Sequence, residues 1–309
     1  MASDSILPSP LRGIVPPMVT PLNAPDRLDR PGLERLIEHI LDGGVHGLFV
    51  LGTTGEAPSL SHRLRQEVIQ HTCDQVQGRV PVLVGITDTA FAESVAMACF
   101  AAETGAQAVV LAPPYYFPAG QPELLEYLEH LVAELPLPLF PYNMPSTTKL
   151  MFEPATVVEA SKIEGIVGLK DSSGNMIYFH QLQKILRDHK DFTLLVGPEE
   201  LLAETILLGG HGGVNGGANL YPRLYVQLYE AAMHGDMNQV KTLQQKVIHI
   251  STTLYGVGHF GSSYLKGLKC ALSVKGICDD FMAEPFHRFR APERQRIEAI
   301  LSELDKLVK

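Results

Sequence analysis

Short apolar runs alternate with amphipathic stretches along most of this 309-residue chain, and this alternation constrains the fold more than any other feature. The apolar runs predict eight β-strands, at residues 13–20, 47–52, 80–86, 108–113, 137–142, 166–170, 192–197 and 212–214. Between them, apolar residues recur at three- and four-residue spacing and predict helices at residues 31–41, 61–76, 92–103, 122–134, 154–161, 176–187 and 199–208. Runs such as VPVLVGI are apolar at nearly every position, which is typical of parallel strands covered on both faces.

Eight such units predict the α/β class and, within it, a (β/α)8 TIM barrel. An open doubly wound sheet is the alternative, but no glycine-rich dinucleotide fingerprint follows the first predicted strand. Helical patterns continue beyond the eighth strand, and the last spans residues 292–308. We therefore predict an N-terminal extension over residues 1–12, the barrel over 13–235, and a C-terminal helical extension over 236–309 that packs on the barrel.

Charge and composition exclude several classes of function. The net charge is −9 and the chain has no run of Lys or Arg, so nucleic acid is not an expected partner. No stretch approaches the roughly 18 apolar residues of a spanning helix, and residues 1–12 lack a secretory pattern, so we expect a cytoplasmic protein without a membrane partner. The histidines and cysteines form no cluster with ligand spacing, and no metal site is expected.

Polar residues follow several of the predicted strands. In (β/α)8 barrels the active site lies at the carboxyl ends of the strands, so these positions would meet at one mouth. The segments concerned are Gly52-Thr53-Thr54-Gly55-Glu56, Pro113-Pro114-Tyr115-Tyr116, Tyr142-Asn143-Met144-Pro145-Ser146 and Lys170-Asp171-Ser172-Ser173-Gly174.

Lys170 ends the apolar run GIVGLK and should emerge from a strand that is buried on both faces. Burial of an amine lowers its pKa and frees it to attack a carbonyl carbon. The alternative is a lysine that reaches solvent or pairs with Asp171. The polar ends of the neighbouring strands favour the first interpretation, which is a Schiff-base lysine.

The other polar strand ends each allow a structural and a functional interpretation. Thr53 and Thr54 could cap a strand-to-helix turn, or they could bind a carboxylate together with backbone N–H groups. Tyr116 and Tyr142 could be interface or core aromatics, or they could form a proton relay with Thr53. The glycine-rich run at residues 209–217 fits no nucleotide-binding spacing, so it predicts a strand that needs close backbone approach and implies no cofactor.

The motifs GTTGE, PPYY, YNMPS and GLKDSSGN resemble, in order and spacing, the dihydrodipicolinate synthase / N-acetylneuraminate lyase family of pyruvate-dependent class I aldolases. The resemblance implies that Lys170 forms an imine with C2 of pyruvate, without an external cofactor or metal. It implies that Thr53 and Thr54 receive the carboxylate and that Tyr142 is the general acid and base. Tyr116 would complete the relay from a neighbouring subunit of a homotetramer built as a dimer of dimers.

The same resemblance bears on the second substrate. Thr147 stands where synthases of this family usually have an Arg, and a neutral Thr cannot form the bidentate ion pair that holds a carboxylate. Ser172 stands where the sialate-lyase and sugar-acid-aldolase branches tend to have Ser or Thr. The pair Glu199-Glu200 resembles the acids with which the sialate lyases bind sugar hydroxyls, although acids in a first helical turn also complement the helix dipole. The remaining positions expected to bind substrate are Gly52, Gly197 and Val214.

These residues predict a lyase that cleaves, condenses or dehydrates a hydroxylated 2-oxo acid through a Lys170 imine, with pyruvate as product or donor. One alternative is 4-hydroxy-tetrahydrodipicolinate synthase, which condenses pyruvate with aspartate-semialdehyde. An alternative of another class is a protein that binds a 2-oxo acid without turning it over.

Overall fold

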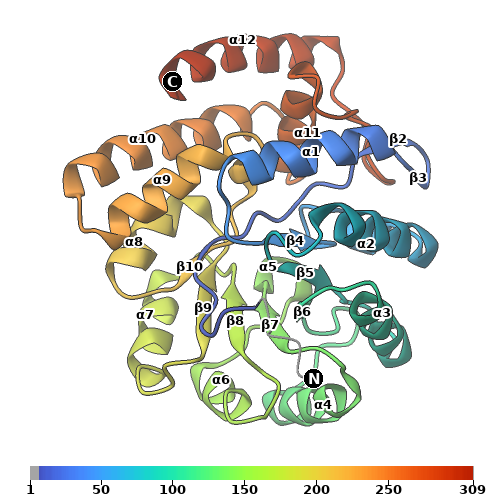
Figure 1. The fold of residues 1–309 in the computed structure, drawn as a ribbon, viewed down its shortest axis with the longest axis vertical. Coiled ribbons are helices and arrows are strands. Elements are labelled where there is room, and N and C mark those ends of the chain that lie inside the picture. The colour runs from blue at the N-terminus through green and yellow to red at the C-terminus, as the bar shows by residue number, and fades with distance from the viewer. Residues whose placement is uncertain (1–6, 309) are drawn as a thin grey trace.

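Eight parallel strands run through the centre of the molecule and form one curled sheet, with helices around it (Figure 1). Their order in the sheet is β1 (Gly13–Ile14), β10 (Gly212–Gly213), β9 (Thr193–Val196), β8 (Gly168–Asp171), β7 (Leu139–Asn143), β6 (Ala108–Leu111), β5 (Val82–Gly85) and β4 (Leu48–Val50). Just beyond β1, the Phe49 N–H donates to the Pro16 carbonyl at 3.0 Å and the Met18 N–H donates to the Phe49 carbonyl at 2.8 Å. These bonds connect the two ends of the strand order. The architecture confirms the α/β class and is consistent with the predicted TIM barrel.

The structure is a computed structural model that describes residues 7–308. Residues 1–6 of the predicted N-terminal extension, and residue 309 of the predicted C-terminal extension, lie outside the described residues. Within the described part of the chain, no helix is both long enough and apolar enough to cross a bilayer.

The helices between the strands lie within a few residues of the predicted positions. They are α1 (Arg30–Asp42), α2 (His62–Val76), α3 (Phe91–Glu103), α4 (Gln121–Glu134), α6 (Pro154–Ala160), α7 (Met176–Ile185) and α8 (Leu202–Leu207). Helix α9 (Pro222–Met233) follows the last strand, where helical patterns continue. The structure adds short elements that were not predicted: the hairpin β2 (Leu22–Ala24) and β3 (Arg27–Leu28), the helix α5 (Pro145–Thr148), and the 3-10 turns η1 (Ala57–Ser59) and η3 (Gly216–Asn219). The first residues of the helix predicted at 199–208 form a separate 3-10 turn, η2 (Glu199–Leu201). The first strand is shorter than predicted because Pro16 and Pro17 have no N–H to donate to a neighbouring strand.

The core has two apolar layers because side chains alternate along each strand. In β4, Leu48 and Val50 pack toward the helices, whereas Phe49 packs in the interior of the curled sheet. Leu11, which precedes the first strand, joins the interior layer, and its N–H donates to the Thr193 hydroxyl at 2.9 Å.

The glycine-rich run forms β10, as its pattern predicts. A Cβ on Gly212 would collide with the backbone of Gly13 in the adjacent β1, so only glycine allows this approach. His211 lies just before the strand, where burial lowers its pKa to about 4 and its Nδ1 accepts a hydrogen bond from the Leu194 N–H at 3.0 Å.

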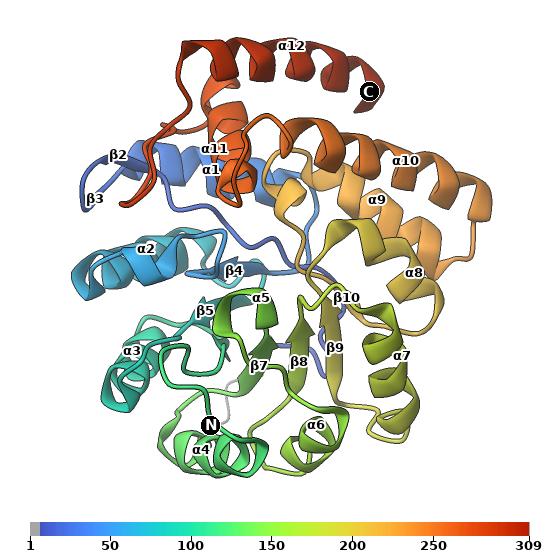
Figure 2. The same ribbon diagram turned by 180° about the vertical axis from the view of Figure 1, so that it is seen from behind.

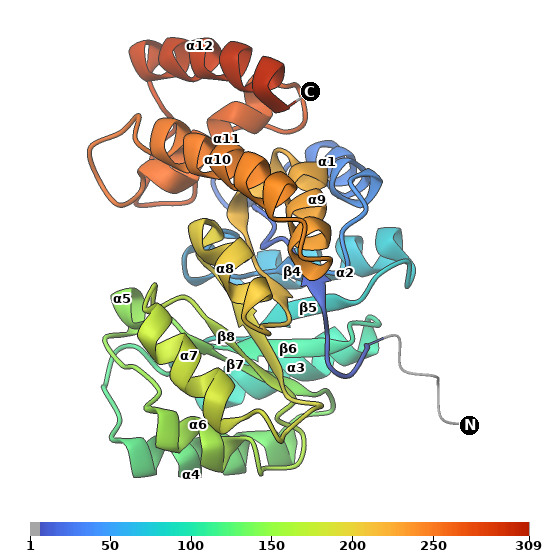
Figure 3. The same cartoon turned by 90° about the vertical axis from the view of Figure 1, so that its left-hand side faces the viewer.

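The C-terminal helices α10 (Met237–Leu254), α11 (Ser263–Val274) and α12 (Ala291–Val308) stack at one side of the molecule, with α12 outermost (Figures 2 and 3). Helix α10 contacts α9 and α12, and α11 contacts η3 and α12. The contact between α11 and η3 brings this helical segment next to the carboxyl end of β10.

A buried ion pair fastens α11 to the turn after β4. The Lys269 Nζ lies 2.6 Å from Glu56 Oε1 and also donates to the Thr20 carbonyl at 2.9 Å, while the Ala283 N–H donates to Glu56 Oε2 at 2.8 Å. Loss of one partner from such a pair costs about 3–5 kcal/mol, because the other charge stays buried and unpaired. Glu56 closes the GTTGE motif, so the C-terminal helices support the turn that carries Thr53 and Thr54.

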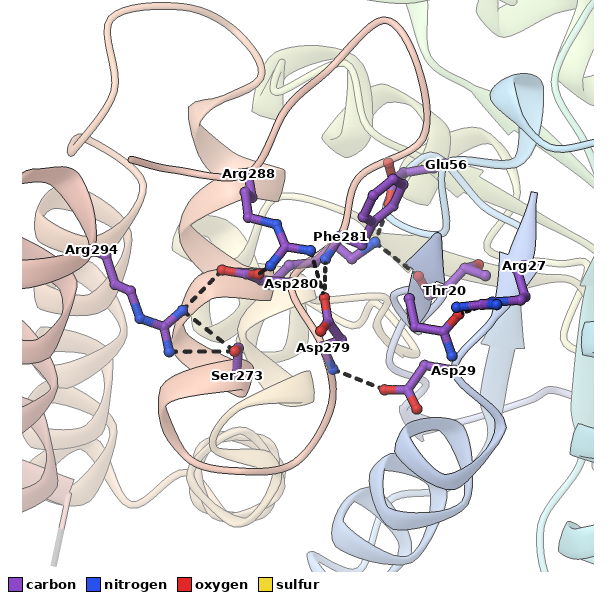
Figure 4. Close-up of polar contacts among 12 residues, drawn as sticks. Thr20, Arg27, Asp29, Glu56, Ser273, Asp279, Asp280, Phe281, Arg288 and Arg294 are labelled. Atoms are coloured by element: carbon purple, nitrogen blue, oxygen red, sulfur yellow. Dashed lines mark hydrogen bonds and ion pairs between the residues drawn. The ribbon is translucent and has the colours of Figure 1, made fainter. Parts of the chain in front are cut away.

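A second polar network fixes the segment between α11 and α12 (Figure 4). Arg288 bridges Asp279 and Asp280 at 3.0 and 3.2 Å, and Arg294 contacts Asp280 at 3.0 Å. The Asp279 N–H donates to the carboxylate of Asp29, which caps the N-terminus of α1. The segment is thus tied to the N-terminal part of the chain.

Candidate active site

A cavity of about 580 Å³ opens at the carboxyl ends of the strands, and residues from the loop after α10 and the start of α11 form part of its wall. It gathers residues from three of the four polar segments that were predicted to meet at one mouth. The predicted site residues that line it are Thr53, Thr54, Tyr142, Thr147, Lys170, Ser172, Gly197, Glu199, Glu200 and Val214.

Lys170 lies in β8 in register with Tyr142 of β7, and its side chain is 4% exposed. Its Nζ is 3.6 Å from the centroid of the Tyr142 ring and 4.9 Å from that of Phe49. Burial lowers the pKa of the amine. The neighbouring carboxylate of Asp171 is engaged elsewhere, since it accepts hydrogen bonds from Asn143 at 2.7 Å and from the Ser173 hydroxyl at 2.9 Å. The geometry therefore favours a nucleophilic amine over an ion pair with Asp171.

Tyr142 connects Lys170 to the hydroxyl of Thr53, which lies 3.4 Å from its phenol oxygen. Burial opposes ionisation of the phenol, but the charge on Lys170 and hydrogen bonds from Ser172 and Thr53 outweigh burial and lower its pKa. The amine and the phenol lie so close that they titrate as a pair. Such a pair can accept and return one proton during a reaction.

The turn that carries Thr53 and Thr54 has a strained backbone. Leu51 and Glu56 adopt left-handed φ angles of 59° and 57°, which cost about 1–3 kcal/mol each for residues other than glycine. The Thr54 hydroxyl lies 3.0 Å from the phenol oxygen of Tyr264 in α11. A strained turn held from outside, beside a buried lysine, is typical of a binding site.

Tyr116 does not join this group within one chain. It is 75% exposed and stacks edge to face on Phe117, with ring centroids 5.0 Å apart. Its neighbour Tyr115 lines a second cavity of about 250 Å³, whose wall also includes Thr53 and Tyr142. The structure thus brings Lys170, Tyr142 and Thr53 together and leaves Tyr116 on the surface.

The other predicted positions lie around the two cavities. Thr147, in α5, is exposed and lines both, whereas Gly52 lines the smaller one. Gly197 lies against Ser172, because a Cβ on Gly197 would collide with the Ser172 hydroxyl oxygen. Val214 is buried in the wall just after β10.

Glu199 and Glu200 differ sharply in environment. Glu199 is 4% exposed; its Oε1 accepts hydrogen bonds from Tyr225 at 2.7 Å and Tyr255 at 2.9 Å, and its Oε2 accepts one from the Gly217 N–H at 2.7 Å. Glu200 is exposed. Both oxygens of Glu199 are held by protein donors, so Glu200 is the acid of the pair that is free to face a ligand.

We expect Glu199 to make stability decrease as pH rises. Burial raises its pKa to about 7 from an ordinary 4.5, so between these values the unfolded chain releases a proton that the folded chain keeps. The free energy of unfolding of the wild type should fall by about 2–3 kcal/mol between pH 5 and pH 8 relative to Glu199→Gln. Denaturant titrations across this range measure the difference. Glu200→Gln is the control and should keep the wild-type slope; a Glu199→Gln slope equal to wild type would refute the assignment.

Three tyrosines around Glu199 and Thr54 were not predicted: Tyr225, Tyr255 and Tyr264. They come from α9, from the residue after α10 and from α11. The other site residues were predicted from polar positions at strand ends, and these tyrosines do not lie at a strand end. Among residues 7–308, no group of three or more His, Cys, Asp or Glu side chains is placed to hold a metal ion.

Eight parallel strands in a curled sheet that is consistent with a TIM barrel, and a buried lysine that lines the cavity, are typical of one class of enzymes. The chain belongs to the Dihydrodipicolinate synthetase family, whose sequence profile matches residues 10–304, and it is a lyase of this family. This finding confirms the predicted family and the predicted enzyme class, and it favours an enzyme over a protein that only binds its ligand.

Individual relatives cover nearly the whole chain. An uncharacterized DapA-like lyase of Halobacterium salinarum is 32% identical over 300 residues, which are 97% of this chain and 96% of that protein. The dihydrodipicolinate synthase of Bacteroides thetaiotaomicron has a solved structure that is 58% identical, with a TM-score of 0.94 over 96% of this chain and 99% of that one. YagE, a prophage protein of E. coli K12 solved in complex with pyruvate, is 29% identical, with a TM-score of 0.89 over 95% and 98% of the two chains.

Proposed function

We propose that Lys170 forms an imine with C2 of pyruvate or a related 2-oxo acid, and that this imine is the electron sink for the carbon chemistry. The observation that carries the proposal is the buried Lys170 amine, whose Nζ lies 3.6 Å from the Tyr142 ring in a cavity large enough for a substrate. Burial lowers the pKa of the amine, and an uncharged amine is the nucleophile that imine formation needs. The reaction requires no metal or organic cofactor.

Tyr142 and Thr53 are suited to move the protons of this reaction. Attack of the amine on C2 gives a carbinolamine, which loses water when Tyr142 protonates its hydroxyl group. In the cleavage direction the C4 hydroxyl loses a proton, the C3–C4 bond breaks, and its electron pair moves into the iminium to give an enamine. The aldehyde leaves, the enamine is protonated at C3, and hydrolysis releases pyruvate and the Lys170 amine.

The turn after β4 is suited to the carboxylate of the 2-oxo acid. Thr53 and Thr54 supply hydroxyl groups, and Gly52 lies directly before them. The strained backbone of this turn and its support by the ion pair of Glu56 with Lys269 favour a fixed binding element over a simple connection.

Tyr116 enters the proposal as a contribution from a second subunit. The smaller cavity borders Thr53, Tyr142 and Tyr115, and the two aromatic residues that follow Tyr115 in the chain, Tyr116 and Phe117, are exposed. We propose that the Tyr116 side chain of one subunit completes the proton relay of its neighbour in a homotetramer built as a dimer of dimers.

The main cavity favours a neutral, hydroxylated second substrate. Among the described residues that line it, Lys170 is the one basic residue, while Glu199 and Glu200 are acids. Ser172 and Thr147, which carry hydroxyl groups, line the same space, with Gly197 and Val214 in the wall. A carboxylated aldehyde would find no Arg or Lys partner here beyond the reacting lysine, whereas sugar hydroxyls would find acceptors and donors.

A second candidate is 4-hydroxy-tetrahydrodipicolinate synthase, because the relative at 58% identity carries the name dihydrodipicolinate synthase. A screen of 2-keto-3-deoxy sugar acids, sialic acid, and pyruvate with aspartate-semialdehyde distinguishes the two. We expect kcat/KM to be at least about 100-fold higher for a hydroxylated 2-oxo acid than for aspartate-semialdehyde with pyruvate. We expect Thr147→Arg to raise kcat/KM for aspartate-semialdehyde. Wild-type turnover of aspartate-semialdehyde at about 1 s⁻¹ or faster, with no cleavage of the other compounds, would favour the synthase.

A further inference from the structure

Tyr264 lies in the first turn of α11, outside the strand ends that carry the proposed reaction. Its phenol oxygen is 3.0 Å from the Thr54 hydroxyl, and both residues line the cavity. Burial, together with the charge of Glu199, raises the pKa of Tyr264, so the phenol keeps its proton and can donate it. A Thr54 hydroxyl that accepts this bond has its own proton available for a ligand oxygen.

The glycine-rich run after β9 provides the space for this contact. A Cβ on Gly216 would collide with the Tyr264 phenol, and a Cβ on Gly217 would collide with that of Tyr225. Glycines that fit no nucleotide-binding motif are thus explained by the phenols that pack against them. The turn that carries Thr54, the glycine-rich run and the start of α11 are distant in sequence but pack closely at this point.

The ring of Tyr264 also contacts a second aromatic side chain. Its ring meets Tyr255 edge to face, with centroids 4.7 Å apart and an interplanar angle of 83°. The Tyr255 hydroxyl donates to Glu199 at 2.9 Å. Contacts therefore run without a break from Glu199 through Tyr255 and Tyr264 to Thr54.

We propose that Tyr264 is a positioning residue that orients the Thr54 hydroxyl toward the carboxylate of the 2-oxo acid. This inference rests on the proposed function, in which Thr54 receives that carboxylate. It assigns to the C-terminal helices a part in substrate binding, besides their packing on the barrel. Tyr264 acts through Thr54 and takes no part in the proton transfers of Lys170 and Tyr142.

Borohydride trapping at Lys170 tests the proposal by comparing pyruvate with methyl pyruvate, an analogue without the carboxylate charge. Tyr264→Phe keeps the ring and removes the hydroxyl. We expect it to raise the pyruvate concentration for half-maximal trapping about 5- to 10-fold and to leave that for methyl pyruvate unchanged. The kcat of the lyase reaction should change less than about 2-fold. Gly216→Ala, which displaces the phenol, should shift pyruvate trapping in the same direction.

Tyr221→Phe is the matched control. Its hydroxyl donates to Asp305 of α12 at 2.8 Å, and Tyr221 does not line the cavity. Removal of this hydroxyl should leave both trapping curves unchanged. An unchanged pyruvate curve for Tyr264→Phe, or equal shifts for both compounds, would refute the positioning role while leaving the imine intact. If wild-type protein is not modified at Lys170 at all, the proposed function fails and this inference with it.

Discussion

Lys170→Met should abolish borohydride trapping of pyruvate and reduce lyase turnover by at least about 10⁴-fold. Methionine preserves most of the side-chain volume between the Tyr142 and Phe49 rings but cannot form an imine. Trapping is measured as added mass on the peptide that contains Lys170, and turnover is measured with the best substrate of the screen. An exposed lysine serves as the control: Lys162→Met, which removes an ion pair with Glu159 at 2.7 Å, should leave both measurements unchanged.

Lys170→Met should not lower the melting temperature. The Lys170 amine is buried without an ion pair to Asp171, whose carboxylate accepts bonds from Asn143 and Ser173. Its replacement by an apolar side chain removes a desolvated amine, so we expect stability to stay equal or to increase. A variant that unfolds would indicate a structural lysine, and a folded variant that still traps pyruvate would refute the imine at Lys170.

Most of the fold could be predicted because the periodicity of apolar residues is a local signal. Each of the eight strands could be predicted from a continuous apolar run. The runs are continuous because strand side chains on both faces of the sheet are buried in one of the two core layers. The hairpin of β2 and β3 was missed because its strands have three and two residues, too few to show a period. The predicted helix at residues 199–208 is divided into η2 and α8, and no composition change marks that division.

The candidate site could be predicted only where the topology itself brings residues together. Lys170 and Tyr142 lie next to the carboxyl ends of neighbouring parallel strands, and parallel strands place these ends at one edge. Tyr264 contacts Thr54 across 210 residues of sequence, and Lys269 reaches Glu56 across 213. Such pairs depend on how the C-terminal helices dock, and no local pattern encodes that docking.

Tyr142→Phe should reduce kcat by about 10²- to 10⁴-fold while changing the pyruvate concentration for half-maximal trapping less than about 3-fold. The phenyl ring still packs over Lys170, so binding and the shape of the cavity are kept. The variant loses the hydroxyl that lies 3.4 Å from Thr53 and that we propose protonates the carbinolamine. Steady-state kinetics and trapping at several pyruvate concentrations give the two quantities separately.

Tyr264→Phe provides the contrast for Tyr142→Phe, because both remove one phenol hydroxyl from the same cavity wall. Loss of the Tyr142 hydroxyl should lower kcat, since we propose that it transfers protons. Loss of the Tyr264 hydroxyl should weaken pyruvate binding, since we propose that it acts through Thr54 on the carboxylate. If one variant changes only kcat and the other changes only pyruvate binding, a general loosening of the cavity is excluded, because loosening would change both quantities in both variants. Equal losses of kcat and binding in Tyr142→Phe would contradict its role as the general acid and base.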